Sequence, residues 1–124
     1  MSVQGLRQRL VAALAGIGFF SLMAGAGGCA YSNHLQKGGK AMRHNNPRVA
    51  LEAFTAAIQI RPDDAEAYFH RSNVYGLLQD WEAAIADLTR AIACDSDYRP
   101  AYYFRAIARV QQKEWEEALS DLSR

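Results

Sequence analysis

Two cysteines and three histidines have the side chains that most often act as nucleophiles, bases or metal ligands. They are Cys29, Cys94, His34, His44 and His70. Metal sites need such ligands at short spacings, as in Cys-x-x-Cys or two histidines on one helix face, and neither arrangement occurs. No glycine-rich loop follows a strand to hold a phosphate. We therefore expect no catalytic residue, metal, cofactor or small-molecule substrate, and Cys94 is expected to pack as a small apolar group.

Cys29 ends a leader that could direct covalent modification of its thiol. Residues 1–9 are basic, residues 10–23 apolar and residues 24–30 small, the order of a secretory signal. The run Ala26-Gly27-Gly28-Cys29 resembles the lipobox of bacterial lipoproteins. This resemblance implies that a diacylglycerol alkylates the thiol and that cleavage makes Cys29 the N-terminus. Ala30, in place of aspartate, then implies sorting to the periplasmic side of the outer membrane.

Two other interpretations of the leader remain open. Ala24-Gly25-Ala26 also fits an ordinary signal-peptidase site, which would release a soluble protein. Residues 10–30 are also long enough to stay as an uncleaved membrane anchor, because about 20 apolar residues span a bilayer. In all three cases residues 30–124 function outside the cytoplasm, and residues 1–29 form a separate signal segment.

Two arginines are each followed, 16 residues later, by an aspartate: Arg71 by Asp87, and Arg105 by Asp121. A basic side chain near a helix–helix interface needs a partner, and an aspartate on the facing helix would supply one. We therefore expect two structural ion pairs. The alternative is two pairs of solvated charges.

The elements that position these residues repeat with a period of 34. When residues 65–90 are compared with residues 99–124, nine of 26 pairs are identical. Chance would give about two at ordinary composition. A period of 34 built from two amphipathic helices is typical of one class of helical repeat protein.

The segment over residues 65–98, AEAYFHRSNVYGLLQDWEAAIADLTRAIACDSDY, resembles the tetratricopeptide repeat along its whole length. The resemblance implies an all-α fold, an α-solenoid of antiparallel helix hairpins with repeats at 31–64, 65–98 and an incomplete 99–124. The expected helices are 34–44, 48–60, 65–78, 81–94, 99–112 and 115–124.

Small residues and turn residues fall where such hairpins need them. Helices that cross closely need small side chains at the contact, and the expected positions are Gly38, Ser72, Ala106, Ala50, Ala84 and Ala118. Asn46 before Pro47 and Asp80 before Trp81 are expected to cap the helices that follow them.

The last helix carries Trp115, Ala118, Leu119 and Leu122, with no polar capping segment after it. Repeat arrays normally end in a cap whose outer face is polar. We therefore expect either that the sequence is a fragment or that another subunit covers this end.

In the tetratricopeptide family, the first helices of successive repeats line a concave groove for a peptide or a partner's helix. The resemblance places nine side chains of this chain along that groove. A carboxylate clamp of lysines, asparagines and an arginine is matched only at Asn73, so a chaperone-tail clamp is not expected. An apolar, aromatic-bearing groove suits a hydrophobic peptide or helix. The expected groove residues are Leu35, Gly39, Met42, Phe69, Asn73, Leu77, Tyr103, Ile107 and Gln111.

The charge balance argues against nucleic-acid binding. Without the signal segment 1–29, which holds two of the fourteen basic side chains, the net charge is −1. Four basic residues and no acid lie between Tyr31 and Arg48. Beside a lipid anchor they could contact anionic headgroups, although a solvated helix face is the simpler interpretation.

The sequence therefore predicts a non-enzymatic envelope lipoprotein whose repeats hold a protein or peptide partner. The alternative is the interaction module of an envelope enzyme, a peptidase or hydrolase, whose catalytic domain lies beyond Arg124.

Overall fold

A computed structural model describes residues 27–124, and residues Tyr31–Arg124 form one compact unit. Most of the expected signal segment, residues 1–29, lies outside the described residues. The described part is all-helical, which confirms the expected α-solenoid. Its helices are residues 27–43, α2 (Pro47–Ile60), α3 (Ala65–Leu77), α4 (Trp81–Cys94), α5 (Arg99–Gln111) and α6 (Trp115–Leu122). Within this part, no helix combines the length and apolarity needed to cross a membrane.

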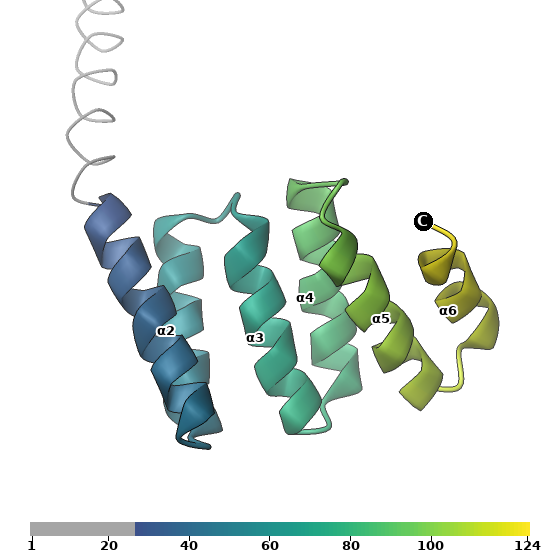
Figure 1. Cartoon of the computed structure of the whole chain (residues 1–124), viewed down its shortest axis with the longest axis horizontal. Coiled ribbons are helices and arrows are strands. Elements are labelled where there is room, and N and C mark those ends of the chain that lie inside the picture. The colour runs from purple at the N-terminus through teal and green to yellow at the C-terminus, as the bar shows by residue number, and fades with distance from the viewer. Residues whose placement is uncertain (1–26) are drawn as a thin grey trace, which may run out of the picture. The chain divides into compact units, whose positions relative to one another are not determined.

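Each helix packs mainly on its neighbours in the chain, so the array is close to one-dimensional. Contacts join α2 to α3, α3 to α4, α4 to α5 and α5 to α6, and a smaller contact joins α3 to α5 (Figure 1). In such a stack, stability is a sum of repeat and nearest-neighbour terms. Among residues 27–124, α6 therefore packs mainly on α5.

The first helix begins earlier than the sequence predicted. It includes residues 27–43 rather than 34–44, because Tyr31 is buried in a cluster with Ala57 and Ala67. The Arg61 guanidinium lies 4.4 Å from the centre of the Tyr31 ring. Burial, assisted by the nearby Asp64 carboxylate, raises the pKa of the Tyr31 hydroxyl. The other five helices begin and end within two residues of their expected bounds.

The turn inside each hairpin has the same backbone conformation in all three repeats. Asn45, Gln79 and Lys113 have positive φ angles of 52°, 59° and 63°. The next residue's amide donates to a carbonyl five residues earlier, as in Asp80 to Tyr75 at 2.9 Å, the arrangement of a Schellman motif.

The predicted helix caps are present in the first two turns. The Asn46 side chain accepts a hydrogen bond from the Val49 amide at 3.3 Å. The Asp80 side chain accepts one from the Ala83 amide at 3.2 Å. These caps satisfy amides that have no partner within the helix. In the third turn the Glu114 side chain forms no such bond.

The small residues lie where helices approach closely. A Cβ atom added at Gly38 would overlap the ring of Phe54, which is itself buried. Ala50, Ala84 and Ala118, at equivalent positions on the second helices, are all buried. Each hairpin therefore depends on a backbone approach that a larger side chain would block.

Candidate partner-binding groove

An apolar pocket of about 380 Å³ lies between the first helices of the three repeats. Met42 contributes from helix 27–43, Asn73 and Leu77 from α3, and Phe104 and Ile107 from α5. The base is formed by residues of α4 and by small residues of α3 and α5, namely Trp81, Ala84, Leu88, Ser72, Gly76 and Ala108. Asn73 is the most polar side chain in this lining, so the pocket suits an apolar group beside one hydrogen-bonding group.

A second pocket of about 420 Å³ adjoins helix 27–43 and α3 and has a different character. Its lining is mostly polar or charged: Leu35, Gln36, Gly39, Lys40, Arg43, Glu66 and His70. Glu66 lies 3.5 Å from the imidazole of His70. On α3 the two pockets share one stripe at helical spacing, formed by Glu66, His70, Asn73 and Leu77. The groove thus has two different ends: a polar end, which carries the basic side chains Lys40 and Arg43, and an apolar end.

The structure divides the groove residues expected from the sequence into separate environments. Met42, Asn73, Leu77 and Ile107 surround the apolar pocket, whereas Leu35 and Gly39 line the polar one. The remaining three, Phe69, Tyr103 and Gln111, line neither of these two pockets.

Phe69 belongs to an aromatic cluster rather than to the pocket wall. Its ring packs edge-on against Tyr98 and Phe104, with centroids 5.5 and 5.2 Å apart. Tyr103 is exposed and packs edge-on against Phe104 at 5.6 Å. The sequence did not indicate Phe104 as a groove residue, because the equivalent residue of the second repeat is His70. His70 instead stacks on Phe54 of the preceding hairpin.

The expected Arg71–Asp87 ion pair is present and holds the middle hairpin together. The guanidinium donates from Nε to Oδ2 at 2.8 Å and from Nη2 to Oδ1 at 2.7 Å. Nη1 also donates to Thr55 Oγ1 on α2 at 3.3 Å. The hydrogen bonds to Asp87 raise the pKa of the guanidinium above its ordinary value. Because one arginine joins three helices, the pair fixes the register between two repeats.

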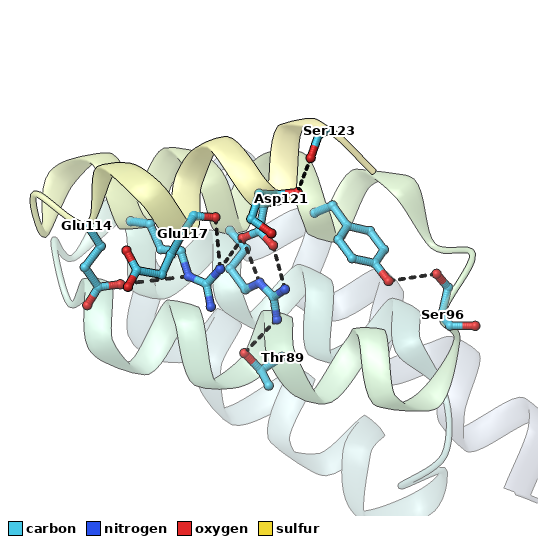
Figure 2. Close-up of polar contacts among 10 residues, drawn as sticks. Thr89, Ser96, Glu114, Glu117, Asp121 and Ser123 are labelled. Carbon is cyan, nitrogen blue, oxygen red and sulfur yellow. Dashed lines mark hydrogen bonds and ion pairs between the residues drawn. The ribbon is translucent and has the colours of Figure 1, made fainter.

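The Arg105–Asp121 pair has the same geometry one repeat later. Its two hydrogen bonds measure 2.9 and 2.6 Å, and Nη1 donates to Thr89 Oγ1 at 3.2 Å. Asp121 and Thr89 lie on opposite sides of that guanidinium (Figure 2). Arg109 adds a further bond to Asp121 at 2.8 Å. The sequence did not indicate Arg109, because Tyr75 holds its position in the preceding repeat.

The cysteines and histidines of residues 27–124 do not form a metal-binding group. His70 stacks on the Phe54 ring, with centroids 5.4 Å apart. Cys94 packs against the core, and its thiol lies 3.8 Å from the Pro62 carbonyl oxygen. Cys29 is exposed.

Antiparallel hairpins stacked in register around a groove define a helical repeat protein. The profile of the tetratricopeptide repeat matches residues 35–99 and 78–124. The chain therefore belongs to the tetratricopeptide repeat family, whose arrays typically serve as protein-interaction modules without catalytic groups. No curated protein matches the sequence significantly.

Solved tetratricopeptide domains have the same fold. The TPR2B domain of yeast Sti1, solved as a pHsp70 complex, is 28% identical with a TM-score of 0.75, over 77% of this chain and 76% of that chain. The second domain of human RPAP3, solved with the HSP70 peptide SGPTIEEVD, is 25% identical with a TM-score of 0.75, over 78% and 81%. The Arabidopsis OM64 domain is 27% identical with a TM-score of 0.72, over 74% and 76%.

Proposed function

We propose that the array is a protein-interaction scaffold that binds an apolar segment of a partner in the groove, at the surface of a membrane of the cell envelope. The apolar pocket between Met42, Leu77 and Ile107 is the observation that carries the binding proposal. A pocket of this size accepts one bulky aliphatic or aromatic side chain, while the Asn73 amide is placed to bond the partner's backbone.

The similar structures support a peptide ligand but not the same ligand. The Sti1 domain is solved as a pHsp70 complex and the RPAP3 domain with an HSP70 peptide, which ends in two glutamates, valine and aspartate. The apolar pocket of this chain has no cationic side chain in its lining; Lys40 and Arg43 line the neighbouring pocket instead. We infer that the apolar contact dominates and that any acidic group of the partner lies toward helix 27–43.

A photocrosslinker at position 77 tests the groove directly. In full-length protein made in its native cells, p-benzoylphenylalanine in place of Leu77 should capture one discrete partner. The same group in place of Glu82, an exposed residue of α4, is the matched control and should capture none. Adding Ile107→Glu should reduce the Leu77 adduct at least about tenfold, because it places an unpaired charge in the pocket. An adduct that Ile107→Glu leaves undiminished would contradict binding in the groove.

The envelope part of the proposal depends on Cys29 and the leader before it. Lipidation would explain why a cysteine follows Ala26-Gly27-Gly28 at the end of a basic and then apolar segment. It would also hold the array at a membrane surface, with the outer membrane as the expected site.

Metabolic labelling tests the anchor. Bacteria that express the full chain should incorporate labelled palmitate into it, and Cys29→Ser should abolish the label. Cys94→Ser is the matched control and should leave the label unchanged, since Cys94 is partly buried in the array. Labelling that survives Cys29→Ser would rule out the lipoprotein and favour one of the other two forms of the leader.

A further inference from the structure

The first helix of the array presents a basic face. Lys37, Lys40 and His44 follow one another at spacings of three and four residues, so they share one side of the helix. All three side chains are exposed, as are those of Asn33 and Gln36 next to them. We call these five residues the basic face. Among residues 27–124, helix 27–43 and α6 lie at opposite ends of the stack (Figure 1).

The same side of the first helix is apolar in the second repeat, where the preceding hairpin covers it. Ala67 and Val74 of α3 are fully buried, and the equivalent residues of helix 27–43 are Asn33 and Lys40. Burying an amide and a charge against another helix without partners is unfavourable. The basic face therefore does not suit a further helical hairpin, but it does suit water or a polar surface.

The charge of the array is divided unevenly along the chain. Residues 31–48 hold four basic and no acidic side chains, a net charge of +4, whereas residues 49–124 hold eight basic and thirteen acidic ones, a net charge of −5. Within the described part of this region, the salt bridges are Arg48–Glu52 and His70–Glu66, and neither includes Lys37 or Lys40. An anionic surface therefore attracts the basic face and repels the rest of the array.

The composition of the basic face distinguishes between a lipid surface and an acidic protein. Among the described residues, the exposed large apolar side chains all lie at or after Leu77. Protein interfaces depend on buried aromatic or aliphatic anchors, and the basic face offers none. Contact with anionic headgroups needs only cations close to the bilayer. The face therefore fits a lipid surface better than it fits a protein.

From these observations we infer that the basic face rests on anionic phospholipid headgroups and orients the array on the bilayer. The inference rests on the membrane location in the proposed function and adds which side of the array meets the membrane. Helix 27–43 lies along the headgroups, and α6 is the helix farthest from them. Met42 follows Lys40 by two residues and so lies about 160° away around the helix axis. The apolar pocket beside Met42 therefore stays open to a partner.

The three lysines of the chain provide the test, because Lys37 and Lys40 lie on the basic face whereas Lys113 is exposed in the turn before α6. Full-length protein is incorporated into phosphatidylcholine nanodiscs with or without about 30% phosphatidylglycerol, an anionic lipid. A trace of acetylating reagent is added, and mass spectrometry measures the acetylation rate of each lysine. We expect phosphatidylglycerol to slow acetylation of Lys37 and Lys40 at least about threefold relative to Lys113, and about 0.5 M NaCl to remove this protection.

Two charge reversals separate the basic face from the overall charge of the array. Lys37→Glu should abolish the protection of Lys40, because it places an acid on the face. Arg99→Glu is the matched control: it makes the same change at an exposed residue of α5 and should leave the protection intact. The inference is overturned if Lys40 is not protected, if its protection is equal in neutral nanodiscs or persists in salt, or if Arg99→Glu also abolishes it.

Size-exclusion chromatography of the same samples separates this inference from the proposed membrane location. If the chain elutes with neutral and anionic nanodiscs but Lys40 is unprotected, the membrane location stands and only the inference fails. If the chain elutes free of both kinds of nanodisc, both fail. If it elutes with anionic nanodiscs alone, and Lys37→Glu releases it, the basic face binds headgroups and the anchor is contradicted.

Discussion

Replacing Asp87 with alanine is expected to lower the free energy of unfolding by about 3–5 kcal/mol, because it leaves the Arg71 guanidinium buried without its carboxylate. The Arg71 and Asp87 side chains are largely buried, and their bidentate pair links α3 to α4 while Arg71 also bonds to α2. The loss should therefore unfold the middle repeat cooperatively, as measured by denaturation of the purified full-length chain followed by circular dichroism.

Two control variants decide whether burial of the ion pair causes the loss of stability in Asp87→Ala. Glu52→Ala removes the acid from the exposed Arg48–Glu52 pair and should cost less than about 0.5 kcal/mol. The double substitution Arg71→Met with Asp87→Leu should recover most of the loss, since replacing a buried pair by apolar groups is often close to neutral. If Asp87→Ala costs no more than Glu52→Ala, the pair does not hold the hairpin together.

Gly38→Ala is expected to destabilise the first hairpin, although alanine is the better helix former. Its Cβ would lie 2.6 Å from Cζ and 2.7 Å from Cδ1 of the Phe54 ring. Overpacking costs roughly 1–3 kcal/mol and outweighs the gain of up to about 1 kcal/mol from helix propensity. Gly39→Ala should instead stabilise by about 0.5–1 kcal/mol, because its Cβ would meet only the Arg43 guanidinium, at 3.8 Å. Chemical denaturation of the two variants measures both changes.

Compensation at Phe54 provides a sharper test of this contact. At the equivalent positions of the other two repeats, a residue larger than Gly38 accompanies a residue smaller than Phe54: Ser72 with Leu88, and Ala106 with Leu122. Phe54→Leu should therefore cost less in the Gly38→Ala background than in the natural chain, as in a double-mutant cycle. Additive effects of the two substitutions would show that the side chains do not compete for space.

The repeat made much of the fold predictable, because a fixed period sets the phase of every helix. It placed the caps at Asn46 and Asp80 and the two arginine–aspartate pairs, since each of these depends on spacing along one hairpin. The early start of the first helix was missed because it depends on Tyr31, whose burial involves residues of the next two helices.

The groove was predictable only in outline for a related reason. Asn73 and Ile107 line the apolar pocket as the family pattern implies, but Phe104 lines it as well and packs against Phe69, which the pattern did not indicate. Arg109 likewise has no counterpart in the preceding repeat, so periodicity could not reveal its bond to Asp121. The side chains that line the groove and its ion pairs differ between repeats. Their packing depends on neighbouring residues that also differ, so a repeat period cannot predict it.

The burial of Tyr31 bears on where the protein meets its partners. Only Ala30 separates it from Cys29, and all three residues lie in helix 27–43, which rises about 1.5 Å per residue. In the lipid-anchored form that we propose, Cys29 would therefore lie only about 3 Å along the helix axis from the first buried side chain. In that proposed form, so short a connection would keep the array next to the bilayer surface. Partners confined to the same bilayer would find it by lateral diffusion, gaining effective concentration without any new contact.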